Sequence, residues 1–414
     1  MATENKKYIP ALRFPEFQND GEWIAKPIKD IAKTFSGGTP TVGNSDYYGG
    51  SIPFIRSGEI TKSTTDLFIT ELGLSSSSAK IVEEGTILYA LYGATSGEVA
   101  ISKIRGAINQ AILAIIPKSR KYVVNYIYYF LKHQKAQILS KYLQGGQGNL
   151  SGAIIDNLSI AFPCDYKGNI SDVEQTKIAD CFVSNDKEID ATKRKLELLK
   201  EHKKGLMQRL FPAKGKTLPE LRFPEFQNDG EWNYEHGDIL YESIVNKKHK
   251  SDLPILAITQ DNGAIPRDDI NYRVVVEDKS IEGYKVVEVG DFIISLRSFQ
   301  GGIEYSRYKG LCSPAYIVLR KRHSTICDDF YRHYFKSFQY IQELNRNLEG
   351  IRDGKMVSYK QFADIKLPYP NYEEQCKIAK VLSSIDDVIQ THIDKISALE
   401  LHKNGLMQQL FPKL

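Results

Sequence analysis

LRFPEFQNDGEW occupies residues 12–23 and returns without a single change at residues 221–232. Identity over the whole of this stretch cannot be a coincidence, so the chain contains an internal duplication. Outward from it, a second pair of similar segments closes each copy. Residues 173–212 end in GLMQRLFP, and their counterpart ends in GLMQQLFP at Pro412. Each copy is about as long as one ordinary domain of roughly 100–200 residues.

The segments between these constant ends are different. Residues 24–165 and 233–370 share only a coarse plan of short β-rich runs and turns, followed by a tyrosine-rich stretch. We expect the tyrosine-rich stretches, 121–143 and 328–348, to be helical. This pattern indicates that the constant ends bind the same kind of partner twice, and that the two variable segments bind two different targets.

The closing segments carry apolar residues at alternating spacings of three and four, which place these residues on one stripe of a helix. We therefore expect two long helices of coiled-coil type, each about 50 Å long and each ended by the proline of its FP dipeptide. Polar residues interrupt the stripe at Asn185, Thr192 and Lys203 in the first segment and at His392 and Lys403 in the second. The predicted seam comprises Ile178, Phe182, Ile189, Leu196, Leu199 and Leu206 in the first segment, and Ile378, Leu382, Ile385, Ile389, Ile396, Leu399 and Leu406 in the second.

Connectivity predicts the direction of these helices. The first helix leads from one variable region to the other. Because the ends of a compact domain usually lie close together, the second helix is expected to start near the end of the first and to run back. The expected molecule is pseudo-two-fold, with two antiparallel helices and one variable domain at each end of the pair.

Composition limits the class of protein. The chain has 414 residues, of which 42% are hydrophobic and 26% charged, and the formal net charge is +4. These values are typical of a globular protein and exclude wholesale disorder. The five cysteines form no C-x-x-C pair, the N-terminus lacks the apolar core of a signal peptide, and no apolar run approaches the ~20 residues that cross a bilayer. We expect a soluble cytoplasmic protein without a membrane partner.

The sequence lacks the motifs of the common nucleotide and DNA chemistries. It contains no G-x-x-x-x-G-K-[ST] loop for ATP and no Pro-Pro-aromatic signature of an amino-methyltransferase. The eight histidines include no H-E-x-x-H or paired metal spacing. We therefore expect no catalytic residues, no metal site and no cofactor in this chain.

Polar and basic residues in the turns are the candidate DNA contacts. Arginine is the best bidentate donor to guanine, glutamine suits adenine, and glycines let a backbone approach a phosphate closely. Any single residue of this kind is more often part of an ordinary solvated turn, but such turns occur at similar places in both copies. The candidates are Ser36, Gly37, Gly38, Thr39, Arg56, Ser57, Tyr92, Thr95, Ser96, Gln144, Gln147 and Asn149 in the first copy, and Gln260, Asn262, Arg267, Arg297, Ser298, Gln300, Arg307, Lys309, Arg352 and Lys355 in the second.

Taken together, these segments resemble the specificity subunit of type I restriction–modification systems, over essentially the whole chain. The similar parts are LRFPEF at the start of each copy, SGGTPTVGNSDYYGGSIPFIRSGEI at 36–60, GATSGEVAISKIRGAINQAILAIIP at 93–117, and EQxKIA leading into a helix that ends GLMQxLFP. One departure is that the second copy lacks the SGGTP…YYGGSIPF stretch. Its recognition domain is therefore expected to belong to a different sequence subclass.

The resemblance implies an α+β fold with two target-recognition domains, each reading one half of a bipartite, asymmetric site on double-stranded DNA. The helices would set the spacing and dock two methyltransferase subunits, and restriction (motor) subunits would join them. S-adenosylmethionine, ATP and Mg²⁺ would bind to those partners, and this chain would not be catalytic. The implied division is 1–172 for the first recognition domain, 173–212 for the first spacer helix, 213–371 for the second domain and 372–414 for the second helix.

Two other interpretations remain open. The mild net charge is compatible with a coiled-coil structural adaptor that does not bind DNA. A stand-alone nuclease or methyltransferase would instead modify DNA unaided, given a divalent metal or S-adenosylmethionine.

Overall fold

The computed structural model describes residues 8–143, 149–250, 252–269, 278–346 and 357–413. The chain forms two compact units. Unit 1 comprises Met1–Thr192 together with Lys395–Leu414, and unit 2 comprises Lys193–Asp394. This division differs from the one expected at 172, 212 and 371, because each unit contains parts of both long helices.

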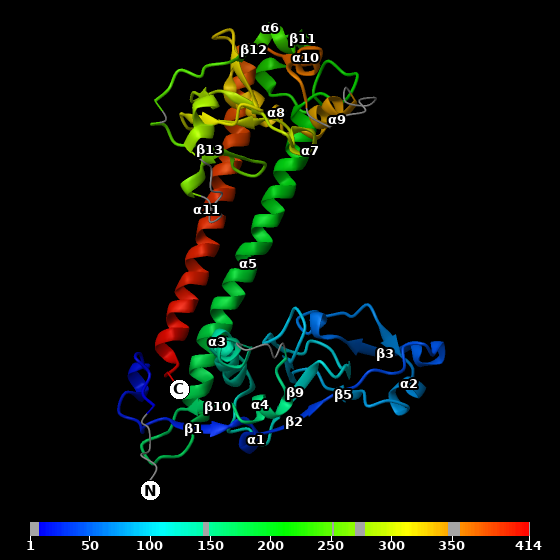
Figure 1. The fold of residues 1–414 in the computed structure, drawn as a ribbon, viewed down its shortest axis with the longest axis vertical. Helices are drawn as coiled ribbons and strands as arrows, with labels where there is room; N and C mark the ends of the chain where they lie inside the picture. Colours follow the sequence, from blue (N-terminus) through cyan, green and yellow to red (C-terminus); the bar gives the residue numbers. More distant parts are fainter. Residues whose placement is uncertain (1–7, 144–148, 251, 270–277, 347–356, 414) are drawn as a thin grey trace. The chain divides into compact units, whose positions relative to one another are not determined.

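The two predicted long helices are present. Helix α5 spans Asp172–Leu210 and α11 spans Tyr372–Leu410, each with 39 residues, which corresponds to roughly 58 Å. Figure 1 shows them as the longest elements of the chain. Both helices end directly before a Phe-Pro dipeptide, as expected where proline cannot continue a helix.

Within each unit the helices run antiparallel, and ion pairs of the same kind fix their register. In unit 1, Lys403 pairs with Asp186, and Lys395 pairs with Glu188 at 2.6 Å. In unit 2, Lys203 pairs with Asp386. The lysines that interrupt the predicted seam are therefore the residues that pair across it, at equivalent places in the two units.

The predicted seam is buried most completely in the first part of each long helix. Its fully buried members are Ile178, Phe182, Ile189, Leu196, Ile378 and Leu382. Its half-buried members are Leu199, Leu206, Ile385, Ile389, Ile396, Leu399 and Leu406. The seam between only two helices is open to solvent along both of its edges, so partial exposure of its side chains is expected.

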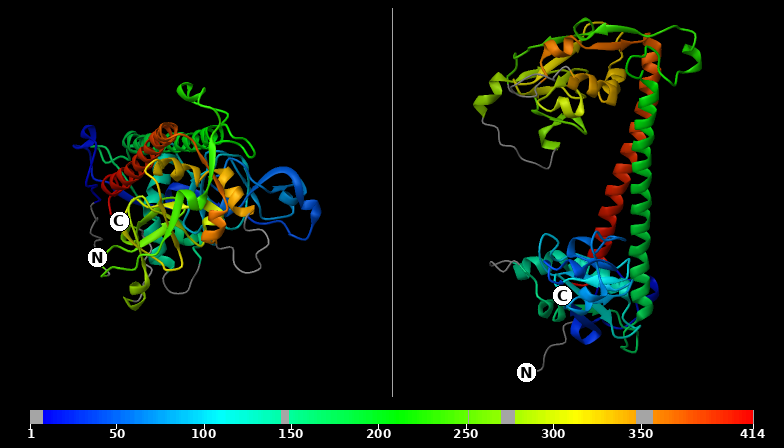
Figure 2. Two further views of the ribbon diagram at one scale, coloured as in Figure 1. Left: turned by 90° about the horizontal axis from the view of Figure 1, so that it is seen from above. Right: turned by 90° about the vertical axis from the view of Figure 1, so that its right-hand side faces the viewer.

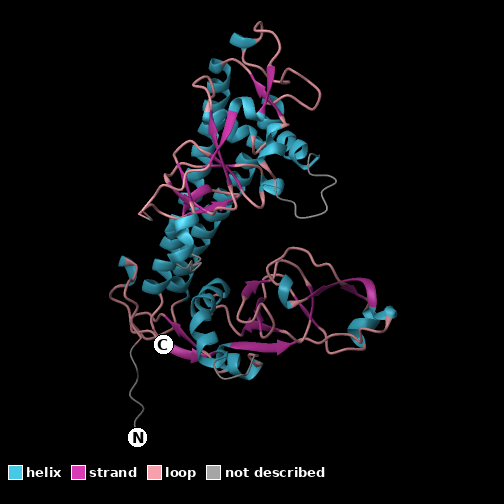
Figure 3. Cartoon of the chain, turned by 45° about the horizontal axis from the view of Figure 1, so that its top comes forward, coloured by secondary structure: helices cyan, strands magenta, loops and turns pink. Residues whose placement is uncertain are grey.

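Unit 1 is built from short strands with helices around them, as Figure 3 shows. One sheet has the order β2-β9-β6-β7 and is antiparallel, another has the order β4-β3-β8-β5 with β3 and β8 parallel, and β1 pairs with β10. The bounds are β1 Ile24–Pro27, α1 Ile28–Ile31, β2 Ala32–Ser36, β3 Tyr48–Ile55, β4 Phe68–Ile69, α2 Glu71–Ser75, β5 Lys80–Val82, β6 Ile87–Ala90, β7 Val99–Ile101, β8 Gly106–Ile108, β9 Ile112–Pro117, α3 Val124–Leu143, α4 Gly152–Asp156 and β10 Ser159–Phe162.

Unit 2 repeats this plan despite its different sequence. Its main sheet has the order β12-β19-β16-β17, and β11 pairs with β20, β13 with β14, and β15 with β18. The bounds are β11 Asn233–His236, α6 Gly237–Leu240, β12 Tyr241–Ile244, β13 Leu256–Thr259, β14 Gly263–Pro266, β15 Lys285–Val287, β16 Phe292–Ile294, α7 Ser298–Gly301, β17 Glu304–Tyr305, β18 Gly310–Cys312, β19 Ile317–Lys321, α8 Asp328–Tyr334, α9 Phe338–Arg346, α10 Tyr359–Ala363 and β20 Lys366–Tyr369. The tyrosine-rich stretch is one helix in unit 1, α3, but two in unit 2, α8 and α9.

The repeated opening segment is held by the same contacts in both units. Arg13 forms a bidentate pair with the buried Glu174, at 2.7 Å for both bonds. Arg222 pairs with Glu374 in the same way, at 2.8 Å. Such forked charge-assisted hydrogen bonds are specific in geometry as well as strong. Part of the sequence identity is therefore explained by internal contacts rather than by a shared partner.

The opening segment also contacts the end of a long helix in each unit. The Leu221 amide donates to Arg209 O of α5, which precedes it closely in the chain. The equivalent bond in unit 1 runs from the Leu12 amide to Gln409 O, near the other end of the chain. Figure 2 shows the blue N-terminal segment beside the red end of α11. Within unit 1 the opening segment thus contacts the end of α11, as the opening segment of unit 2 contacts the end of α5.

Candidate nucleic-acid interface

In unit 2 the structure brings three candidate side chains to one exposed surface. Gln260, in the turn between β13 and β14, donates from Nε2 to the Arg297 carbonyl at 3.3 Å. Arg297 precedes α7, and Gln300 lies within that helix. Gln260, Arg297 and Gln300 are all exposed. Within the described residues no acidic side chain pairs with Arg297, so its guanidinium is free to meet a base edge or a phosphate.

Lys336, beside these loops, holds them in place. Its Nζ donates to the carbonyls of Gln260 at 3.2 Å and Gly301 at 2.9 Å, and to Glu304 Oε1 at 2.5 Å. Glu304 is only 1% exposed, and its second oxygen has no hydrogen-bond partner in the described structure. Burial raises the pKa of the Glu304 carboxyl to about 7, although the neighbouring Lys336 opposes this shift.

Of the remaining candidates of unit 2, Ser298 and Arg267 are less accessible and Lys309 is already paired, whereas Arg307 and Asn262 are accessible. Ser298 is buried, and its Oγ accepts from the Ser295 amide at 2.9 Å. Lys309 pairs with Glu288 at 3.0 Å. Arg267 is half-buried after β14. Arg307 is exposed in the turn after β17, and Asn262 is exposed in the turn before β14.

In unit 1 the glycines of the SGG turn are explained by packing. A Cβ added at Gly37 would lie 1.8 Å from the Ile108 carbonyl oxygen, and one added at Gly38 would lie 2.6 Å from the Ser78 Cβ. The predicted reason for these glycines was a close approach to phosphate, but the close approach that the structure contains is to neighbouring protein segments, β8 among them. Ser36, at the end of β2, is half-buried, and Thr39 is exposed and hydrogen-bonds Gln110 at 2.5 Å.

Arg56 is tied to a buried carboxylate. It bonds Glu59 at 2.9 and 3.1 Å, and Ser57 begins the short 3-10 helix that leads to this glutamate. Hydrogen bonds from the Arg56 side chain lower the pKa of the Glu59 carboxyl to about 2, against the effect of burial. The Arg56 side chain remains 48% exposed, so it combines a structural role with an accessible edge.

The GATSG turn and the loop after α3 meet in unit 1. The Leu150 amide donates to the Leu91 carbonyl at 2.9 Å, which places the exposed Asn149 beside the turn that carries Tyr92, Thr95 and Ser96. The three turn residues are half-buried. Directly after the turn, Glu98 pairs with Lys135 of the tyrosine-rich helix. Gln144, Gln147, Arg352 and Lys355 lie outside the described residues.

Sequence reasoning missed the residues that support these turns. Lys336 and Glu304 were not predicted, and neither were Lys135 and Glu98. The sequence signal was weak in each case. Glu304 lies among apolar neighbours in a short strand. A carboxylate in such a place needs a basic partner, but the sequence does not indicate which residue that partner is.

The described residues give no sign of a metal centre or a membrane span. In the part of the chain that the structure describes, no three His, Cys, Asp or Glu side chains gather as a metal-binding group. None of its helices combines the length and the apolar character that a membrane span requires.

A model of the type I restriction modification DNA specificity domain matches residues 20–201 and again residues 213–401. The chain belongs to this family of type I DNA specificity subunits. The two matched ranges correspond to the two copies of the duplication. The type I restriction enzyme MjaVIII specificity subunit of Methanocaldococcus jannaschii is 24% identical over 98% of this chain and 95% of that protein. The MjaIX specificity subunit of the same organism is 32% identical over 44% of this chain and 41% of that protein.

A solved structure supports the fold of the specificity subunit. The S subunit of a type I restriction–modification system from M. genitalium matches with a TM-score of 0.61 and 16% identity, over 98% of this chain and 99% of that chain. The predicted family and fold class, with two mixed domains, two long antiparallel helices and an internal repeat, are therefore confirmed. As a type I specificity subunit, the protein works with DNA and with other subunits.

Proposed function

We propose that each unit of this specificity subunit reads one half of a bipartite, asymmetric site on double-stranded DNA, and that α5 and α11 set the gap between the halves. The observation that carries this proposal is the contrast inside each unit. The same Arg–Glu pair, the same strand order of the main sheet and the same helix contacts recur, whereas the exposed turns differ. One scaffold used twice with different turns suits two different half-sites.

The helices and opening segments are proposed to dock two methyltransferase subunits. Gln18 and Asn19 are exposed in unit 1, and their identical counterparts Gln227 and Asn228 are exposed in unit 2. No hydrogen bond or ion pair of these four side chains occurs within the described residues, so internal contacts do not explain why they are repeated. A repeated, exposed surface suits a partner that binds twice.

Catalysis and its cofactors are assigned to the partners. The methyltransferase subunits would hold S-adenosylmethionine, and the restriction (motor) subunits would hold ATP and Mg²⁺. The specificity subunit would contribute no catalytic group, and its task would be to position the partners over the sites that its turns select.

Reconstitution tests this function. The chain is purified with its methyltransferase, the mass of the complex is measured, and methyl transfer to duplex DNA is followed with S-adenosylmethionine. We expect one copy of this chain with two methyltransferase subunits, and no transfer by the chain alone. A stable one-to-one complex under saturating partner contradicts the symmetric docking. A complex that shows no salt-dependent gel shift with duplex DNA supports the structural adaptor instead.

A further inference from the structure

Unit 1 carries a basic surface near Ala32, where β2 begins. We name it the lysine face; it comprises Lys26, Lys29, Lys33, Lys118, Arg120 and Lys121. Backbone pairing gathers these residues from distant segments. Lys33 faces Ile116 across β2 and β9, and the Lys118 amide donates to the Ile31 carbonyl at 2.8 Å. All six side chains are exposed except that of Lys26, which is half-buried.

The charges of the lysine face are not neutralised internally. Lys29 Nζ bonds the neutral Asn157 at 2.8 Å, and Lys118 Nζ bonds the Lys29 carbonyl at 2.6 Å. None of the six cations forms an ion pair within the described part of the chain. Within residues 26–33 and 118–121 the one acidic residue is Asp30. Asp156 of α4 accepts a hydrogen bond from Thr34 of β2.

Three of the six positions, those of Lys26, Lys29 and Lys33, have an acidic counterpart in unit 2. The strand registers define the equivalence, because Lys26 faces Ile160 in the β1–β10 pair as Glu235 faces Leu367 in the β11–β20 pair. The following helix and strand match without a gap, so the counterparts of Lys26, Lys29 and Lys33 are Glu235, Asp238 and Glu242.

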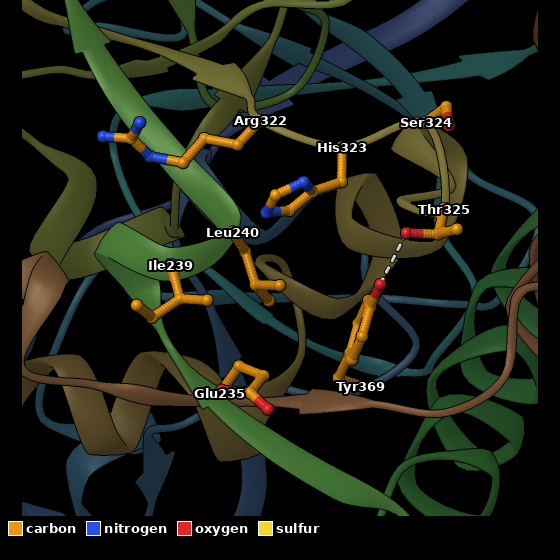
Figure 4. Close-up of a pocket in the computed structure, with 8 residues that line it drawn as sticks. All are labelled: Glu235, Ile239, Leu240, Arg322, His323, Ser324, Thr325 and Tyr369. Carbon is orange, nitrogen blue, oxygen red and sulfur yellow. Dashed lines mark hydrogen bonds between the residues drawn. The ribbon is translucent and has the colours of Figure 1, made fainter.

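After β9, Arg120 and Lys121 have neutral counterparts in unit 2, whereas Lys118 corresponds to the basic Arg322. The Arg322 amide donates to Leu240 as the Lys118 amide does to Ile31, so Ser324 and Thr325 stand where unit 1 has Arg120 and Lys121. Figure 4 shows this part of unit 2 as a hollow lined by Glu235, Arg322, two apolar side chains and several polar side chains. Thr325 is bonded to Tyr369 at 2.6 Å.

We infer that the lysine face of unit 1 binds the phosphate backbone of duplex DNA outside the half-site that unit 1 reads. This inference rests on the proposed function. A partner that docks twice in the same way needs the same surface twice, so the reversed charges exclude this face from the two-fold docking of methyltransferases. The ligand of the lysine face therefore binds to unit 1 and has no equivalent site on unit 2. Protein interfaces are depleted of lysine relative to the rest of the surface, whereas clustered lysines are the electrostatic footprint of a nucleic-acid backbone.

The test is the salt dependence of binding to a non-cognate duplex, measured on the complex with methyltransferase. Each phosphate contact that is lost should reduce the slope of log K against log[salt] by about 0.9. The triple variant K26Q/K29Q/K33Q should therefore lower the slope by about two to three. It should weaken cognate and non-cognate binding by the same factor and leave the methylated motif unchanged. The matched control is E235Q/D238Q/E242Q in unit 2, which should not weaken binding.

If the triple variant does not fold, the double variant K33Q/R120Q replaces it, since neither of these side chains makes a hydrogen bond within the described structure. An unchanged salt slope in a complex that still methylates its bipartite motif overturns the inference and leaves the proposed function intact. Self-association of the wild type that the triple variant abolishes also overturns it, because the acidic face of a second copy would then be the occupant. A wild-type complex that reads no bipartite motif overturns the proposed function itself.

Discussion

Arg297 is an exposed arginine whose main chain is held in place by neighbouring side chains, as a residue that reads a base requires. Its carbonyl is bonded by Gln260, and Lys336 holds the neighbouring carbonyls of Gln260 and Gly301. R297A should cost about 1–3 kcal/mol and relax only one half of the recognised site. Methylome sequencing of cells that express the variant checks this. Equal weakening at every target, with the motif unchanged, would identify Arg297 as a phosphate or structural residue. R346A, which breaks the exposed pair with Glu343 in the same unit, is the matched control.

Glu304 should make folding depend on pH. Its folded pKa of about 7 lies above the usual 4.5, so between these values the folded state binds more protons than the unfolded state. This group therefore favours folding most at low pH, and its contribution falls as pH rises from about 4.5 to about 7. E304Q removes this component. The free energy of unfolding, measured with urea at several pH values, should change in favour of E304Q relative to wild type as pH rises. A difference that does not change with pH would contradict the assignment.

At the level of elements, the paired lysines in the seam should specify register. Asp186 meets Lys403 in unit 1, and Tyr129 also donates to Asp186 at 2.8 Å. A double-mutant cycle with D186N and K403M should give a coupling energy of about 0.5–3 kcal/mol. The exposed pair Lys200–Glu197 should give about 0.3–0.5 kcal/mol. Equal, small couplings for both pairs would mean that the seam lysines do not fix the register.

The elements also show what a sequence can and cannot predict. The helices were predictable to within four residues at each end, because apolar spacings of three and four that continue over this length are typical of a long amphipathic helix. The Lys336–Glu304 pair was not, since its partners are 32 residues apart and nothing local links them. Gly37 and Gly38 were correctly predicted to let the backbone approach another group closely. The identity of that group depends on tertiary packing, which the sequence does not reveal.

At the scale of the whole molecule, the helices that join the units should act as a ruler. Duplicating four residues after Leu196 and four after Ile396 adds ~6 Å to each helix, equivalent to one or two base pairs at ~3.4 Å each. Four residues exceed one turn by about 40°, so the seam must repack slightly. The methylated motif should keep both half-sites and gain one or two unspecified bases between them. Activity with an unchanged gap would show that the helices do not set the spacing.

The most direct test of the central claim is methylome sequencing of a chimera in which residues 24–162 replace residues 233–369. The replaced strands begin and end at equivalent positions, β1 to β10 and β11 to β20, and the Arg–Glu pairs lie outside the exchange. If each unit reads one half-site through its own turns, the pseudo-two-fold chimera must read the same half-site twice on opposite strands. The account predicts a palindromic motif built from the first half-site. An asymmetric motif that retains the original second half would contradict it.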